Sequence, residues 1–178
     1  MYKEVEGDLI HLAREGKFQV VGHGCNCFCT MGAGIAPIMA KEFGCNTFPL
    51  EYKEHKGDIN KLGQIDYKIL NQYKPEFGGN WVLYPDEEHF TTGKKIAVVN
   101  IYSQYGFGLN HEGGSEKPID YDALTLAFRK MNHIFKFKHI GLPGLIGCGL
   151  AGGDPLIVKD IIKKELKDCY VTIVYLKK

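Results

Sequence analysis

The chain alternates between short apolar runs and longer segments whose apolar residues recur at a helical spacing, and this alternation constrains the fold most strongly. Strands are expected within the ranges 18–22, 81–84, 95–102, 139–146 and 170–176. Helices are expected at 8–16, near 34–43, at 121–135 and at 155–167. Strands that alternate with helices are typical of an α/β fold with a largely parallel sheet. The pattern is irregular over residues 45–80, and no strand is assigned there.

The length and composition are those of one globular domain. The 178 residues predict a single domain over 1–178, since domains hold roughly 150 residues. Hydrophobic residues make up 44% and charged residues 24%, which excludes a collagen-like, coiled-coil or disordered chain. The 22 basic and 21 acidic residues leave a net charge of +1, so no strong nucleic-acid binding is expected, although a local basic patch stays possible.

The sequence also bears on the compartment. No apolar run approaches the roughly 20 residues of a membrane span, and the first residues, MYKEVEGD, do not read as a signal peptide. We therefore expect a cytoplasmic protein without a membrane partner, and a monomer. Six cysteines are too few for a disulfide-stapled secreted domain, so reduced thiols are expected.

Two glycine-rich turns are the features that point to a ligand. HGCNCFCTMGAGIA (23–36) and PGLIGCGLAGGD (143–154) each leave a predicted strand and lead into a predicted helix. In α/β sheets, ligands bind outside the carboxyl ends of the strands. Glycines let backbone amides approach a ligand, and helix N-termini favour anions. Two such turns facing one crevice would suit a diphosphate.

Other motif readings fit less well. Gly32 and Gly34 could begin a dinucleotide fingerprint, but Pro37 occupies the position of its third glycine. No P-loop run occurs in the sequence. The alternating cysteines at 25, 27 and 29 could share one face of an extended segment, but their spacing is shorter than zinc sites prefer. No metal is expected, and small buried thiols are the simpler interpretation.

Two polar residues beside these turns have both a structural and a catalytic interpretation. His23 ends the strand that feeds the first turn, and it is either an acid or base or a buttress of the loop. Asp154 precedes Pro155, which is ordinary chemistry for the start of a helix, and a catalytic carboxylate is the alternative.

Residues after the central predicted strand could also contact a ligand. Tyr105 and Phe107 could pack over a nucleotide or ribose, or form the edge of the core. His111 and Glu112 lie in a polar stretch that reads as an exposed loop or as a mobile lid.

Four segments, taken in order, resemble the macro domains, a family of ADP-ribose-binding modules. They are GDLI (7–10), CNCFCTMGAGIA (25–36), VVNIYSQ (98–104) and GLPGLIGCGLAGGD (141–154), and the resemblance covers nearly the whole chain. The first loop is similar to that of the subgroup containing ADP-ribose 1''-phosphate phosphatases and enzymes that remove ADP-ribose from glutamate or nucleobases. The resemblance implies a three-layer α/β/α sandwich with a mixed, largely parallel sheet.

The resemblance also implies ligand-binding residues. Asp8 would accept a hydrogen bond from the adenine amine, and Ile35 and Tyr175 would lie near the base. Residues 32–34 would follow the diphosphate and distal ribose, and residues 147–151 would offer amides to the phosphates. The implied ligand-binding set is Asp8, Leu9, Ile10, Gly32, Ala33, Gly34, Ile35, Gln104, Gly147, Cys148, Gly149, Leu150, Ala151 and Tyr175.

The chain departs from the glutamate-cleaving subgroup at the positions of catalysis. An aspartate follows the G-C-G-L run there, whereas Ala151 stands here and Asp154 is the nearest acid. That subgroup also uses a mid-chain lysine, which Lys68 matches only by rough position. The expected catalytic residues are therefore Asn26, His23 and Asp154, with Asn26 or His23 orienting a water.

The function expected from the sequence is ADP-ribose binding, with hydrolysis at the distal ribose and no cofactor. The reaction would remove a 1''-phosphate or cleave an ADP-ribosyl link. Two alternatives remain: a reader of ADP-ribose without chemistry, or a binder of another NAD-derived ligand or a nucleic-acid end.

Overall fold

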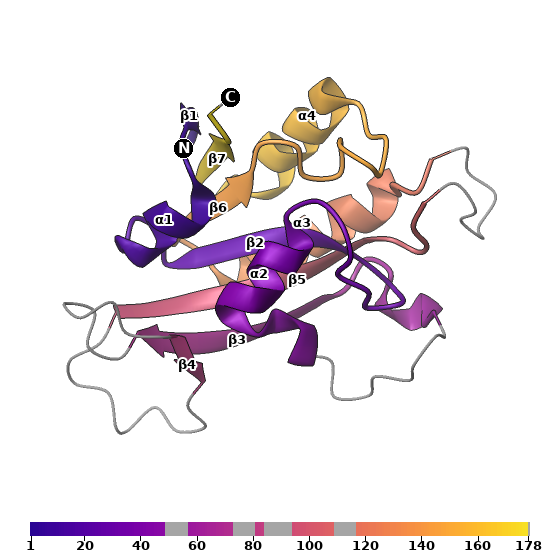
Figure 1. Ribbon diagram of the computed structural model, residues 1–178. Helices are drawn as coiled ribbons and strands as arrows, with labels where there is room; N and C mark the ends of the chain where they lie inside the picture. Colours follow the sequence, from indigo (N-terminus) through magenta and orange to yellow (C-terminus); the bar gives the residue numbers. More distant parts are fainter. Residues whose placement is uncertain (49–56, 73–80, 84–93, 109–116, 178) are drawn as a thin grey trace.

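A mixed β-sheet forms the centre of the computed structural model, which describes residues 1–48, 57–72, 81–83, 94–108 and 117–177. Its described part has seven strands in the order β1-β7-β6-β2-β5-β3-β4 (Figure 1). The first five in this order are parallel, β3 is antiparallel to β5, and β4 is antiparallel to β3. The strands are β1 (Tyr2–Glu6), β2 (Val20–Asn26), β3 (Ile65–Gln72), β4 (Trp81–Leu83), β5 (Lys94–Gln104), β6 (His139–Pro143) and β7 (Tyr170–Tyr175).

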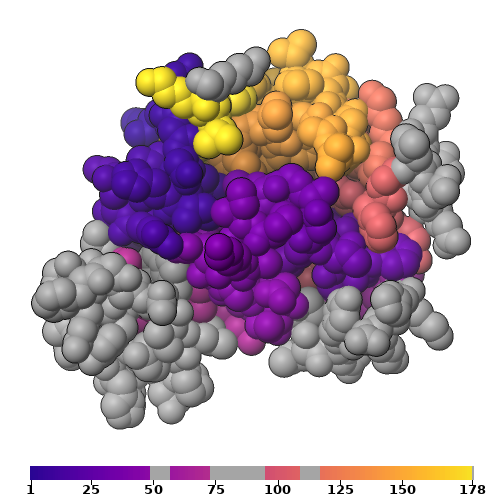
Figure 2. All heavy atoms as spheres, in the orientation of Figure 1, coloured from indigo at the N-terminus to yellow at the C-terminus, as the bar shows by residue number. Residues whose placement is uncertain are grey.

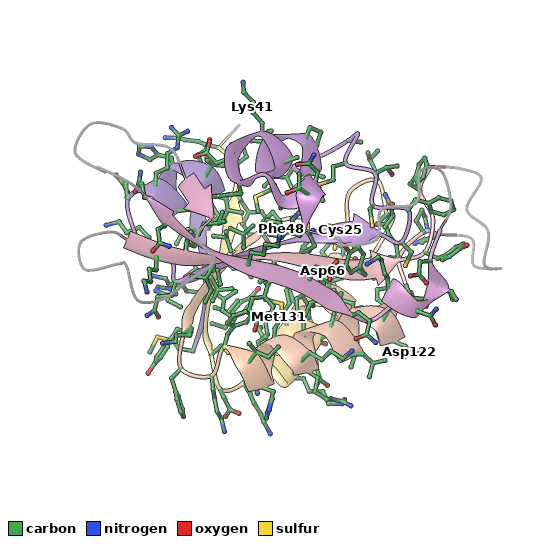
Figure 3. The ribbon with its side chains drawn as sticks, turned by 90° about the horizontal axis from the view of Figure 1, so that it is seen from below. Cys25, Lys41, Phe48, Asp66, Asp122 and Met131 are labelled. Carbon is green, nitrogen blue, oxygen red and sulfur yellow. The ribbon has the colours of Figure 1, made fainter. Side chains whose placement is uncertain are left out.

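Helices cover both faces of this sheet. The α-helices of the described chain are α1 (Leu9–Arg14), α2 (Ala36–Phe43), α3 (Tyr121–Ile134) and α4 (Pro155–Glu165). Short 3-10 turns occur at Cys45–Thr47 and Ile59–Lys61. Figure 3 shows Phe48 on the face that carries α2, and Met131 on the opposite face beside α3. None of the helices in the described ranges is long and apolar enough to cross a membrane.

The sheet separates two apolar cores. On the α3 and α4 side, Phe128 and Met131 pack with strand residues such as Ile101. On the α1 and α2 side, Met39 packs with Val98 and its neighbours. Successive residues of β5 point to opposite faces, so this strand is apolar on both and contributes to both cores. Each fully buried large apolar side chain contributes about 1.5–3 kcal/mol.

The predicted α/β/α architecture is confirmed, and all four predicted helices form, with small shifts in their ends. Three helices begin at an aspartate whose carboxylate accepts a backbone N–H: Asp8 from His11 N, Asp120 from Ala123 N and Asp154 from Leu156 N. These caps are local in sequence, which is why the helix starts could be predicted.

Three strand assignments need correction. The strand expected at 18–22 is β2, which continues to Asn26, so the first part of the expected turn is strand. β1 was not predicted, because it lies at a sheet edge and is largely exposed and charged. β3, within the unassigned range 45–80, is also half-exposed over its first residues. Exposed strands lack the apolar repeat on which such predictions depend.

Candidate functional site

A cavity of about 940 Å³ lies at the carboxyl ends of β2, β5 and β6. Its walls come from the loop between β2 and α2, the loop between β6 and α4, and the segments that follow β5 and precede α3 (Figure 1). The described residues that line it are Gly24, Cys25, Asn26, Thr30, Gly32, Ala33, Gly34, Ile35, Ala36, Gln104, Phe107, Gly108, Lys117, Pro118, Pro143, Leu145, Ile146, Gly147, Gly149, Leu150, Ala151 and Gly152.

The first glycine-rich loop, residues 27–35, is anchored by the last residue of β2. Asn26 Nδ2 donates to Thr30 O at 3.0 Å, and Asn26 Oδ1 accepts from Phe28 N at 3.0 Å and from Thr30 N at 3.3 Å. Cys29 adopts a left-handed conformation, with φ of 57°. Both ends of the Asn26 amide are thus engaged in closing this turn.

The rest of the first loop leaves its backbone amides unused. The N–H groups of residues 31–36 have no hydrogen-bond partner in the part of the chain that the structure describes. Gly34 has φ of 63° and Ile35 is right-handed, an alternation that points successive amides into one concavity. α2 then begins without a side-chain cap, and a Cβ placed on Gly32 or Gly34 would meet nothing within 4 Å. This loop therefore presents free donors to open space.

The second glycine-rich loop, residues 144–154, is folded back on itself. Gly149 N donates to Leu145 O at 3.3 Å, and Gly153 N donates to Gly147 O at 2.8 Å. The loop ends at Asp154, whose carboxylate accepts from Leu156 N at 2.8 Å and so occupies the start of α4. Within the described chain, the N–H groups left without a partner in residues 147–151 are those of Gly147, Leu150 and Ala151.

The structure brings most of the predicted ligand-binding residues to this one cavity. They span three segments far apart in the sequence, and both glycine-rich loops contribute. The predicted residues found in the described wall are Asn26, Gly32, Ala33, Gly34, Ile35, Gln104, Gly147, Gly149, Leu150 and Ala151.

Other predicted binding residues lie outside the wall. Asp8 is exposed, Leu9 is buried in the core, and Ile10 is partly buried beside it. Cys148 lies in the second loop, where its thiol contacts Ile146 O. Tyr175 ends β7, and its ring packs against the backbone of the second loop at residue 144.

The predicted catalytic residue His23 is enclosed beneath the cavity. Its side chain is fully buried, and its Nε2 lies 2.8 Å from Asn100 Oδ1 and 3.5 Å from the sulfur atoms of Cys25 and Cys45. Burial lowers the pKa of His23 to about 4, although the hydrogen bond to Asn100 opposes this shift. A neutral imidazole without a place in the cavity wall cannot exchange protons with a ligand there, so its position is that of a buttress.

Two further candidates also lie away from the wall. The carboxylate of Asp154 caps α4. Lys68 lies on β3, with its Nζ 5.5 Å from the centre of the Phe48 ring. The structure therefore does not bring Asp154, His23 and Lys68 together with Asn26.

An aromatic cluster forms the β5 end of the cavity. The rings of Phe28 and Tyr105 are 5.4 Å apart, and those of Phe28 and Phe107 are 5.6 Å apart, each in an edge-to-face arrangement. Phe107 lines the cavity and is 50% exposed, whereas Tyr105 supports the cluster from outside the wall. The polar stretch with His111 and Glu112 lies outside the described residues.

Sequence reasoning missed Lys117 and Pro118, wall residues that precede α3 and have no motif around them. Pro143 and Leu145 also line the wall and were not assigned to the site, although they lie within the predicted second turn (143–154). The proline-glycine pair at the end of β6 was the signal for them, since it marks a turn at a strand end.

The comparisons with known proteins agree with the fold. No family model matches the chain. A curated protein of Enterobacteria phage T4, an uncharacterized 17.5 kDa protein in the tk-vs intergenic region, is 29% identical over 176 residues, which is 97% of this chain and 94% of that protein. The macrodomain of Mycobacterium tuberculosis DarG has a TM-score of 0.60 and 16% identity, covering 98% of this chain and 97% of that chain.

A second similar structure was determined with a ligand. Thermosipho africanus DarTG in complex with ADP-ribose has a TM-score of 0.60 and 15% identity, over 98% of this chain and 41% of that one. At these identities the likeness concerns the fold. The order and direction of the strands, the helix layers and these structural neighbours together show that the chain has the macrodomain fold.

Proposed function

We propose that this protein binds ADP-ribose or a close derivative in the cavity between its two glycine-rich loops, and that it hydrolyses a bond at the distal ribose. The observation that carries the proposal is the set of unpartnered amides of residues 32–36 in the wall of a cavity of about 940 Å³. A cavity of this size is within the usual range for small-molecule sites. Amides and an uncapped helix start are donors suited to phosphates. The ADP-ribose complex of a protein with this fold supports the choice of ligand.

The adenine would extend from the β6 end of the cavity toward the end of β7 and the start of α1. Gly7 N donates to Tyr175 O at 2.9 Å, so the start of α1 adjoins the end of β7. Asp8 Oδ1 accepts from His11 N at 3.0 Å, and the second carboxylate oxygen would accept from the adenine amine. Ile35, in the wall of the cavity, would pack near the base.

The diphosphate would lie between the two loops, and the distal ribose would lie toward β5. Residues 32–34 on one side and Leu150 and Ala151 on the other would donate to the phosphates. Gln104, at the end of β5, and the exposed ring of Phe107 would border the distal ribose.

Hydrolysis at this ribose would consume one water and break the bond to the substituent on C1''. The hydroxyl group of the water would be retained by one product of the cleavage. The other product, the leaving group, would take the electrons of the broken bond and the second proton of the water. Because the Asn26 amide is engaged by the first loop, its part would be to hold that loop in place beside the reacting carbon. Positioning and hydrogen bonds to developing charge would supply the rate enhancement.

A reader without catalytic activity is the second candidate, and one observation favours it. No carboxylate and no imidazole belongs to the described part of the cavity wall. A water would therefore lack an obvious general base among these residues.

Calorimetric titration with ADP-ribose and AMP, run beside hydrolysis assays, tests both candidates. ADP-ribose should bind far more tightly than AMP, because AMP lacks the second phosphate and the distal ribose. Turnover of a phosphate-, protein- or base-linked ADP-ribose would support the enzyme, and tight binding without turnover would support the reader. Equal affinity for AMP and ADP-ribose would contradict the proposed site.

A further inference from the structure

Gln104 carries a hydrogen-bond acceptor that nothing in the described chain uses. Three side chains of the described cavity wall contain an oxygen atom, and those of Asn26 and Thr30 bond to each other and to the backbone of the first loop. The side chain of Gln104 makes one hydrogen bond, in which Nε2 donates to Gly106 O at 2.7 Å. Because only the amide nitrogen can donate to a carbonyl oxygen, the free atom is Oε1, which can accept but not donate.

We propose that Gln104 determines which substituent the distal ribose carries. Its Oε1 accepts a hydrogen bond from a hydroxyl or N–H group on C1'', so the cavity takes ADP-ribose, or ADP-ribose linked through such a group, in preference to the 1''-phosphate. This inference rests on the proposed function and narrows it to one class of distal substituent.

Gln104 belongs to the wall because the sheet changes register at this point. Cys25 of β2 pairs with Tyr102 of β5, but the next residue, Asn26, pairs with Gln104. Ser103 is therefore an extra residue on β5, as in a β-bulge. Bulges are frequent beside active sites, where they redirect a side chain. Here the bulge places Gln104 next to Asn26, where the first loop begins.

Several segments fix the position of Gln104. Its carbonyl accepts from Cys27 N at 3.1 Å, and it forms an antiparallel bridge with Ile119, which precedes α3. The bond from Nε2 to Gly106 O orients the side chain as well. The residue is half-buried, and Oε1 is not among the enclosed polar atoms of the described residues. An acceptor fixed in this way loses little conformational entropy when a ligand binds, so it can discriminate between ligands.

The distal end of the ligand is the part that would reach Gln104. In the proposed placement the diphosphate lies between the loops, and Gln104 and Phe107 border the ribose. The diphosphate is attached at C5'', and C1'' lies on the far side of the sugar ring, so its substituent extends away from the loops. Gly106, which holds the amide of Gln104, directly precedes Phe107, whose half-exposed ring lines the same end of the cavity.

A neutral acceptor at this place distinguishes a hydroxyl group from a phosphate. A hydroxyl or N–H group donates to Oε1, whereas an ionised phosphate ester presents only acceptor oxygens and negative charge. Two acceptors in contact lose their hydrogen bonds to water without forming a new one, and this mismatch rejects a ligand more strongly than a missing contact would.

The test is calorimetric titration with ADP-ribose and with ADP-ribose 1''-phosphate at about pH 8, where the phosphate ester is ionised. The unaltered protein should bind ADP-ribose at least about tenfold more tightly than the 1''-phosphate. Gln104→Met keeps the length of the side chain without its amide, so ADP-ribose affinity should fall about five- to tenfold and the preference should shrink to within about threefold. Gln104→Glu adds a negative charge and should increase the preference for ADP-ribose.

An arginine-linked ADP-ribose, which carries an N–H group on C1'', separates the two kinds of donor. Binding as tight as that of ADP-ribose would support recognition of nitrogen links as well as of the free hydroxyl group. Binding as weak as that of the 1''-phosphate would support recognition of the hydroxyl group alone.

Gln19→Met is the matched control, because Gln19 is exposed at the opposite end of β2, where its Oε1 accepts from His139 N at 3.0 Å. It should leave both affinities unchanged, and melting temperatures show whether each variant is folded. Equal affinity of the unaltered protein for the two ligands, tighter binding of the 1''-phosphate, or an equal loss for both ligands in Gln104→Met would overturn the inference while leaving the proposed function intact. Failure of the unaltered protein to bind ADP-ribose would instead overturn the proposed function, and this inference with it.

Discussion

The two glycine-rich loops look equivalent in the sequence but differ in what they offer a ligand. The first loop, residues 27–35, leaves the amides of residues 31–36 without partners in the described chain and leads into a helix without a side-chain cap. The second loop, residues 144–154, uses several of its amides internally and ends on the cap of Asp154. Figure 2 shows both on the same face of the molecule, the first in purple and the second in orange. Glycine content therefore predicts backbone freedom, not which donors remain available.

The largest expected effect comes from filling the first loop. Gly34→Val should abolish detectable ADP-ribose binding, because the side chain would occupy the open space beside the free amides. The left-handed φ of 63° adds a strain of about 1–3 kcal/mol, which the fold should withstand. Melting temperature and affinity are measured on one sample.

Gly32→Val is the matched variant, since its Cβ also meets open space but its φ is not positive. It should lose binding with little change in melting temperature. Near-normal affinity in both variants would remove the first loop from the site.

The second-largest expected effect is on the stability of the fold. It comes from His23, on the strand that leads into the first loop, and it depends on pH. The pKa of His23 is lowered to about 4, so the folded state disfavours its protonated form. The stability that depends on neutral His23 is fully present above pH 6.5, which is about the pKa of histidine in the unfolded chain. It is lost as the pH falls from 6.5 toward 4, because over this range the unfolded chain binds the proton and the folded protein does not. The loss attributable to His23 over this window should be about 3 kcal/mol.

Chemical denaturation of the unaltered protein and of His23→Gln at several pH values measures the pH-dependent contribution of His23 to the free energy of unfolding. The variant should be less stable at neutral pH but flatter between pH 6.5 and 4. Parallel pH profiles for the two proteins would show that His23 is not the buried titrating group.

A smaller effect is expected from filling the second loop. A Cβ on Gly149 meets nothing within 4 Å, so Gly149→Val should project into the cavity without disturbing the core. Because this loop has fewer free amides, ADP-ribose affinity should fall only about tenfold, or about 1.4 kcal/mol. Calorimetric titration of Gly149→Val beside Gly32→Val compares the loops directly. A larger loss of ADP-ribose affinity in Gly149→Val than in Gly32→Val would show that the second loop contributes more to binding than the first.

The smallest effect is expected from the cap that closes the second loop. Asp154→Ala should lower the free energy of unfolding by about 1 kcal/mol, the typical cost of an N-cap. ADP-ribose affinity and any turnover should stay within about threefold, since Asp154 is outside the described wall. Denaturation and activity assays on Asp154→Ala, with Asp154→Asn as the variant that keeps a cap, check this. Loss of turnover with normal stability in both variants would restore a catalytic role to Asp154.

Local signals in the sequence were sufficient for much of the fold and part of the site. The aspartate caps at 8 and 154, the apolar runs of the interior strands and the clusters of glycine all lie within a few neighbouring residues. These patterns predicted an α/β fold with a largely parallel sheet, the helix starts and the two loops that meet at the cavity, whereas the three-layer α/β/α arrangement was implied by the resemblance to macro domains.

Tertiary structure alone decided the rest, because it depends on contacts between residues far apart in the chain. The sequence left His23 as either an acid or base or a buttress, and the fold decided between them: Asn100 Oδ1, 77 residues away in the chain, accepts a hydrogen bond from the ring nitrogen of this buried residue. Lys117 belongs to no motif, and it reaches the cavity because Ile119 pairs with Ala151. The sequence by itself determined where the backbone can turn and which segments form helices or interior strands. The packed fold determined which amides, charges and side chains face the ligand, since burial and hydrogen bonding are properties of the assembled walls.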